Sequence, residues 1–180
     1  MSGLLETLRR FTGLLDRNHT EYMVIGGYAL PFYGRIRTTL DLDVAVAVED
    51  DKFRILCSRA AEDGYQVSLD SPLNPYCIYM DTVTRFEVEV WRRPDGIKWN
   101  HETLRRRRRF SVDGLGLWVV SPEDFIVTKL ARPDRSAQDE MDVKSVLERS
   151  GVELDWGYLR SRAEDAQVWG ILQAIHDSTL

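Results

Sequence analysis

The chain has 180 residues, of which 43% are hydrophobic and 29% are charged, a balance that is typical of a globular protein and excludes a disordered chain or a repetitive fibre. Its formal net charge of −5 disfavours a protein that binds long nucleic acids mainly through its overall charge. No apolar run is long enough to cross a membrane and the N-terminus lacks a signal-peptide pattern, so we expect a cytoplasmic protein with no membrane partner. The two cysteines have no metal-binding spacing, so we expect reduced thiols.

Hydrophobic periodicity and turn residues predict the secondary structure of the first two thirds of the chain. In chain order the expected elements are a helix over 3–17, a strand over 22–25, a short helix from Tyr28 that ends at Gly34, a strand over 40–48, a helix over 51–63, and strands over 65–69, 76–81, 85–91 and 115–120.

After residue 120 the pattern changes to helices. Ser121 and Pro122, followed by two acids, are typical of a helix start. The expected helices cover residues 121–131, 136–149, 155–166 and 168–177. We therefore predict an α/β (α+β) fold, in which a small mixed sheet flanked by helices forms residues 1–120 and a helical part forms residues 121–180.

Two aspartates interrupt the most apolar strand of the chain. Asp41 and Asp43 are separated by one residue, so both point to the same face of that strand. Two like charges on one buried face are costly, and a divalent metal between them would remove the conflict. Glu87 and Glu89 have the same spacing on a later strand, so three or four carboxylates would converge if the two strands are neighbours. Such oxygen ligands favour Mg²⁺ or Mn²⁺.

The glycine pair Gly26-Gly27 lies between a predicted strand and a predicted helix, 14 residues before Asp41. Glycine lets the backbone approach a ligand closely, and a helix N-terminus favours phosphate. A phosphate-binding turn followed by a metal-binding pair is suited to phosphoryl or nucleotidyl transfer.

The segment from Gly26-Gly27 to Arg37-Thr38-Thr39-Leu40-Asp41-Leu42-Asp43 resembles the signature of the nucleotidyltransferase superfamily, which has a DNA polymerase β-like fold. The Arg-x-Thr-x-Asp-x-Asp form resembles a small stand-alone bacterial branch that includes AbiEii-like toxin–antitoxin proteins. Two later segments are similar to further motifs of that branch, a helix with a lysine at 121–130 and an Asp-x-x-Asp helix at 139–143.

The resemblance implies transfer of a nucleoside monophosphate from a nucleoside triphosphate, with ATP as the first choice, to a hydroxyl acceptor. It implies that Asp41 and Asp43 bind Mg²⁺ or Mn²⁺ and that Glu89, with Glu87 as the alternative, is the third acid and activates the hydroxyl. It implies that Gly26 and Gly27 contact phosphate and that Lys129 offsets the charge of the triphosphate. Arg37 and Thr39 are implied to orient the loop or to touch the triphosphate, and Asp139 to orient Lys129 or to lie near the active site.

The acceptor is left open by the sequence. A protein hydroxyl, a tRNA or a small molecule such as an antibiotic would each suit the chemistry, and the resemblance adds a toxin or antitoxin partner. The run Arg105–Arg109 either steers an anionic ligand or lies on a solvated helix and strand edge. Two other functions stay open, a non-catalytic nucleotide-binding or antitoxin-like partner protein and a metal-dependent phosphohydrolase.

Overall fold

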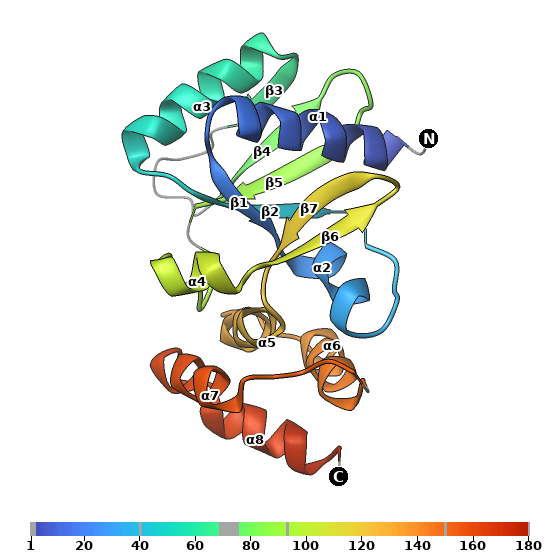
Figure 1. Ribbon diagram of the computed structural model, residues 1–180, viewed down its shortest axis with the longest axis vertical. Coiled ribbons are helices and arrows are strands. Elements are labelled where there is room, and N and C mark those ends of the chain that lie inside the picture. The colour runs from blue at the N-terminus through green and yellow to red at the C-terminus, as the bar shows by residue number, and fades with distance from the viewer. Residues whose placement is uncertain (1–2, 40, 69–75, 93, 150, 180) are drawn as a thin grey trace.

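The computed structural model describes residues 3–39, 41–68, 76–92, 94–149 and 151–179. Its centre is a mixed seven-stranded sheet with the strand order β3-β4-β5-β2-β1-β7-β6 (Figure 1). The strands are β1 (Glu21–Val24), β2 (Leu42–Ala47), β3 (Tyr65–Ser68), β4 (Tyr76–Asp81), β5 (Glu87–Trp91), β6 (Arg108–Val112) and β7 (Leu115–Val119). β2 is parallel to β5 and β1 is parallel to β7, while the other neighbours are antiparallel. The predicted α/β fold with a mixed sheet is confirmed.

Eight helices accompany the sheet in the described part of the chain. They are α1 (Gly3–Arg17), α2 (Gly26–Tyr33), α3 (Asp50–Glu62), α4 (His101–Arg106), α5 (Pro122–Ala131), α6 (Ala137–Glu148), α7 (Trp156–Asp165) and α8 (Trp169–Asp177). α1 and α3 lie across one face of the sheet, while α5 to α8 gather beyond it at the lower end of Figure 1. None of the described helices is long and apolar enough to cross a membrane. The division of the chain near residue 120 stays a prediction.

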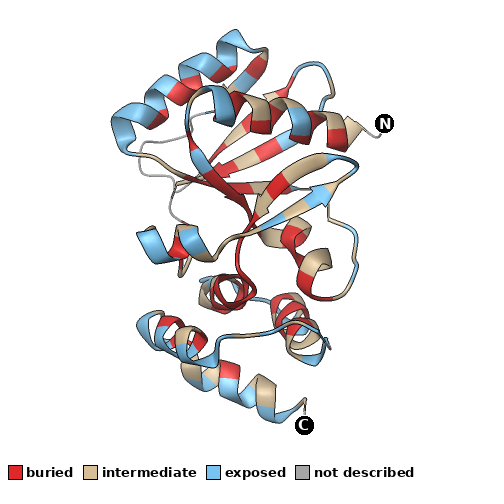
Figure 2. Ribbon diagram, viewed as in Figure 1, coloured by how far each residue is buried: buried red, intermediate tan, exposed pale blue. Residues whose placement is uncertain are grey.

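Aromatic packing joins α1 to the sheet. The ring of Phe11 meets Tyr65 and Tyr79 edge to face, at centroid distances of 5.9 and 5.7 Å, and all three residues are buried. Figure 2 shows buried residues along the strands of the sheet. The hydroxyl of Tyr79 contacts the Sγ atom of Cys57 at 3.2 Å, and both Cys57 and Cys77 are buried free thiols. This packing decides which face of β3, β4 and β5 points inward.

Three local predictions differ from the structure. Helix α2 begins at Gly26, so the glycine pair belongs to the first helical turn and does not precede it. Strand β2 begins at Leu42, so Asp41 lies before the strand and is exposed, and the expectation that it is buried is wrong. Strand β6 was not predicted, because its first residues continue the arginine run, yet it pairs along its whole length with β7.

Candidate active site

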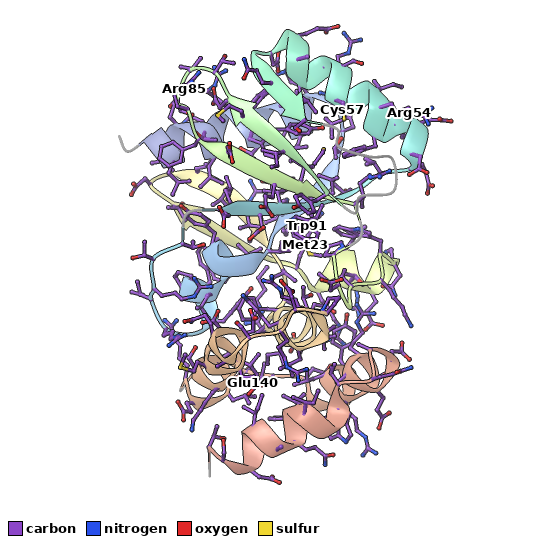
Figure 3. The ribbon with its side chains drawn as sticks, turned by 180° about the vertical axis from the view of Figure 1, so that it is seen from behind. Met23, Arg54, Cys57, Arg85, Trp91 and Glu140 are labelled. Atoms are coloured by element: carbon purple, nitrogen blue, oxygen red, sulfur yellow. The ribbon has the colours of Figure 1, made fainter. Side chains whose placement is uncertain are left out.

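Two neighbouring parallel strands place a pair of carboxylates opposite each other. In the register of β2 and β5, Asp43 is the direct partner of Glu89. Both side chains point to the face of the sheet that α1 and α3 do not cover, and both are half-buried. The indole Nε1 of Trp91 donates a hydrogen bond to Oδ1 of Asp43 at 3.1 Å (Figure 3 labels Trp91). The strand order thus brings together two of the predicted acids, and Trp91 fixes one of them.

The electrostatics of this pair suit a bound cation. Burial raises the pKa of Asp43 to about 7, and the adjacent carboxyl of Glu89, which shares a hydrogen bond with it, adds to the rise. The hydrogen bond from Trp91 acts in the opposite direction but is too weak to offset both. Because a divalent cation would stabilise both ionised carboxylates, this oxygen donor pair fits Mg²⁺ or Mn²⁺.

The other two predicted acids are less enclosed. Asp41 is exposed and raises the pKa of Asp43 only weakly, and Glu87 is exposed beside Met80 at the start of β5. Within the described residues, no group of three histidine, cysteine or acidic side chains is arranged to hold a metal ion as it stands. Direct pairing with Asp43 favours Glu89 over Glu87 as the third acid.

The glycine pair is packed against two other predicted site residues, Asp43 and Thr39. Gly26 has a φ of +62°, and a Cβ atom added to it would lie 1.9 Å from Oδ2 of Asp43. A Cβ atom on Gly27 would lie 2.6 Å from Oγ1 of Thr39. The backbone N–H of Ile25, which precedes the pair, donates to the carbonyl of Asp43 at 3.0 Å. Only glycines allow the N-terminus of α2 to lie this close to the carboxylate and to the threonine.

Helices α5 and α6 supply a buried lysine with two carboxylates. Nζ of Lys129 lies 2.9 Å from Oδ1 of Asp139 and 3.4 Å from Oδ2 of Asp142. Asp139 also closes a capping box with Ser136 at the start of α6, so its position is fixed by the helix itself. The structure therefore brings Lys129 and Asp139 together.

Asp142 is the centre of a larger ionic cluster. Its buried carboxylate accepts hydrogen bonds from both guanidinium groups of the loop after α2, at 2.9 Å from Arg35 and 3.1 Å from Arg37, and from Gln138 at 3.0 Å. Arg37 therefore contacts α6. The cluster ties the segment that leads into Asp41 to α6, whose carboxylates pair with Lys129 of α5.

A small open cleft lies between Asp43 and Lys129. Its polar wall includes Asp43, Lys129 and Arg132, and its apolar wall includes Trp91 and Phe125. The cleft thus places cations from α5 opposite the carboxylate and beside the first turn of α2. This arrangement can hold a triphosphate and a divalent cation together.

The comparison with protein families agrees with this geometry. A family model described as "Nucleotidyl transferase of unknown function (DUF2204)" matches residues 4–167. The chain belongs to this family of nucleotidyl transferases. No curated protein sequence matches the chain. The narrower resemblance to AbiEii-like proteins stays a prediction.

Solved structures of nucleotidyltransferases share the fold of this transferase at low sequence identity. The complex of ANT(2″)-Ia with adenylyl-2″-tobramycin has a TM-score of 0.59 at 14% identity, over 98% of this chain and 99% of that one. The lincomycin-bound lincosamide antibiotic adenylyltransferase LnuA has a TM-score of 0.55 at 10% identity, over 78% of this chain and 94% of that one. An antigenic nucleotidyltransferase-like protein from Paracoccidioides brasiliensis has a TM-score of 0.54 at 16% identity, over 99% of this chain and 93% of that one.

The arginine run of the transferase contacts its own neighbours. Arg106 pairs with Asp155 at the start of α7, at 2.9 Å, and Arg107 pairs with Glu21 of β1. The other arginines of Arg105–Arg109 contact Glu102, the carbonyl of Glu153 and the ring of Trp118. The run therefore joins α4 and β6 to β1, β7 and the start of α7.

Sequence reasoning missed three residues of this site. Trp91 is two positions after Glu89 on an alternating strand, which was the signal that it shares the face of the acids. Arg35 and Arg132 gave no comparable signal, because each reaches the site from a loop or a helix end whose path depends on the tertiary fold.

Proposed function

We propose that this transferase moves a nucleoside monophosphate from a nucleoside triphosphate, ATP first among them, to a hydroxyl acceptor in a reaction that depends on Mg²⁺ or Mn²⁺. The observation that carries the proposal is the pairing of Asp43 with Glu89, directly beside the glycine N-terminus of α2. Carboxylates and a phosphate-binding turn are the two parts that nucleotidyl transfer requires, and here they are in contact.

Two of the acids would bind the cation, and the third would act on the acceptor hydroxyl. Asp41 and Asp43 would hold the divalent cation, with Glu89 as the third acid. A bound divalent cation supplies charge stabilisation at the α-phosphate and at the leaving pyrophosphate. Glu89 accepts the proton of the attacking hydroxyl. The Trp91 indole holds Oδ1 of Asp43, which keeps that carboxylate in place while the charge nearby changes.

The opposite wall of the cleft would bind the triphosphate. Gly26 and Gly27 are the first residues of α2. Their N–H groups would donate hydrogen bonds to phosphate oxygens at the N-terminus of the helix. Lys129 and Arg132 line the same cleft and offset the negative charge. Asp139 orients Lys129, and Thr39, packed on Gly27, supports the turn. Arg37 acts through Asp142, so its role is to position the loop.

Among acceptors, we favour a small molecule over a tRNA or a protein hydroxyl. Support comes from the two antibiotic adenylyltransferases among the structural neighbours, one bound to lincomycin and one to adenylyl-2″-tobramycin. No comparison supports a toxin or antitoxin partner as directly.

The test is transfer of label from α-³²P-labelled triphosphates with Mg²⁺ or Mn²⁺. Purified protein is incubated with small-molecule, tRNA and protein pools, and both pyrophosphate and labelled product are measured. Asp43→Asn should abolish both and keep the fold, whereas Asp51→Asn, an exposed acid at the start of α3, should leave both unchanged. Full activity of Asp43→Asn would overturn the proposal.

A further inference from the structure

In the described part of the chain, no helix lies over one face of β3, β4 and β5. The opposite face is packed under α1 and α3, where Tyr79 is completely buried. Because side chains alternate along a strand, Tyr76, Ile78 and Met80 of β4 point to the open side, and all three are half-buried, while Gln66 of β3 is exposed. Figure 3 looks onto this side and shows β4 and β5 facing the viewer with no helix in front of them. A sheet face with an apolar stripe is left open next to the active site.

The open face continues directly into the catalytic pair. Across β4 and β5 the facing pairs on this side are Tyr76 with Trp91, Ile78 with Glu89, and Met80 with Glu87. The rings of Tyr76 and Trp91 stack at a centroid distance of 4.5 Å and an angle of 27°. Trp91 is also the residue whose indole N–H holds Asp43. The Tyr76–Trp91 pair therefore lies next to Glu89, the residue that the acceptor hydroxyl must approach in the proposed reaction.

The two sides of the active site carry opposite charge. Lys129 and Arg132 of the α5 segment lie on the triphosphate side. On the open side, Glu87 and Glu89 project from β5, and no residue of β3, β4 or β5 is a lysine, arginine or histidine. The carboxylates of Glu87 and Glu89 would repel a polyanion such as RNA. A ligand with a positive charge would meet these carboxylates and the aromatic Tyr76–Trp91 pair, and both carboxylates and aromatic rings attract an ammonium ion.

We infer that the acceptor is a small organic cation that carries a hydroxyl group, with its amine or ammonium against the Tyr76–Trp91 pair and its hydroxyl at Glu89. The inference rests on the proposed function. In the transfer, the acceptor oxygen forms a bond to the α-phosphorus and the bond from that phosphorus to the bridging oxygen breaks. The hydroxyl proton passes to Glu89, and the electron pair of the broken bond leaves with pyrophosphate.

The first experiment measures binding without turnover. Choline and its neutral isostere 3,3-dimethylbutan-1-ol are titrated into ¹⁵N-labelled protein, and the indole N–H signal of Trp91, identified with Trp91→Phe, is followed. Choline should shift this signal and bind at least about fivefold tighter than the isostere, while the signal of Trp156 in α7 stays still. Tyr76→Leu should reduce the preference, and Asp51→Asn should keep it. Equal binding of the two probes would overturn the inference.

The second experiment asks where label goes in a mixture. A small-molecule extract is divided on a cation-exchange resin at pH 7, and each fraction is incubated with protein, Mg²⁺ and α-³²P-labelled ATP. Label should enter compounds of the retained, cationic fraction. Label in the flow-through, in RNA or in protein would overturn the inference and leave the proposed function standing. Choline binding without any Mg²⁺-dependent binding of ATP would overturn the proposed function instead and leave the cation surface standing.

Discussion

Gly26 approaches Asp43 so closely that a single methyl group does not fit between them. Its φ is +62°, and an added Cβ atom would lie 1.9 Å from Oδ2 of the carboxylate. The first turn of α2 and the carboxylate of Asp43 are therefore one packed unit. A change at the glycine must move one of the two.

Gly26→Ala should therefore reduce turnover by about 100-fold, because a displacement of roughly 1 Å at a reacting group costs that much. Gly114→Ala is the matched control, since Gly114 has a φ of +78° with no atom within 4 Å of the added Cβ. Both variants should lose about 1–2 kcal/mol of stability from the positive φ. Turnover and thermal melts separate the two effects. Equal turnover of both variants would show that the contact with Asp43 is unimportant.

Lys129 gives a second prediction, on triphosphate binding. Lys129→Met should raise the KM for ATP by about 10- to 100-fold, which is the value of a hydrogen bond to a charged group. The kcat should fall less. Lys144→Met, on the same helix as Asp139, is the control, because Nζ of Lys144 makes two long contacts, with Glu148 at 3.7 Å and with the carbonyl of Ser178 at 3.4 Å. An unchanged KM with a lower melting temperature would assign Lys129 to the ionic cluster alone.

The carboxylate face could be predicted from sequence because its evidence is local. Alternation on two short apolar strands placed Asp43 and Glu89 on faces that later proved to be shared. Their direct pairing could not be predicted, since the register between parallel strands depends on packing far along the chain. Alternation alone does not separate Glu87 from Glu89; the resemblance to the family favoured Glu89, and the register pairs Glu89 with Asp43.

The ionic cluster around Asp142 could not be predicted from local sequence. Arg37 was expected near the phosphates from its place in a motif, but its guanidinium contacts Asp142, which is 105 residues away in sequence. Nothing in the sequence around either residue indicates this pairing. Strand β6 was missed because two arginines at its start indicated a charged segment, although each of them covers an aromatic ring, Tyr33 or Trp118.

Asp142 predicts how stability depends on pH. Burial alone would raise the pKa of this carboxyl, but hydrogen bonds from Arg37, Arg35 and Gln138 outweigh it and hold the pKa below its usual value near 3.8. A lowered pKa in the folded state stabilises the protein above the ordinary pKa, and this contribution is lost as the pH falls through the folded value. Asp142→Asn should therefore cost about 3–5 kcal/mol at pH 7.

The deficit of Asp142→Asn relative to the wild type should shrink as the pH falls below about 4. Urea unfolding at a series of pH values measures it. Asp177→Asn, an exposed acid in α8, should show no deficit at any pH. A deficit of Asp142→Asn that stays constant down to pH 3 would mean that the ionic cluster does not stabilise the fold through its charge.

The last prediction concerns how α7 is held against α5. Nε of Arg162 lies 2.9 Å from Oδ1 of Asp124, and both side chains are buried, with exposed fractions of 7% and 1%. Arg162 also donates to the carbonyl of Gly96, next to Asp95 in the cleft wall. Removing one partner of a buried ion pair leaves an uncompensated charge, so Arg162→Met should cost about 3–5 kcal/mol.

The control for this prediction is an ion pair of the same region that is exposed. Lys98 and Asp165 lie 2.9 Å apart, but their side chains are 63% and 53% exposed, so Lys98→Met should leave the melting temperature unchanged. Chemical denaturation of both variants gives the comparison. If Arg162→Met were as stable as Lys98→Met, the buried pair would not be what fixes α7. The position of the Gly96 turn at the cleft would then depend on the packing of the neighbouring helices alone.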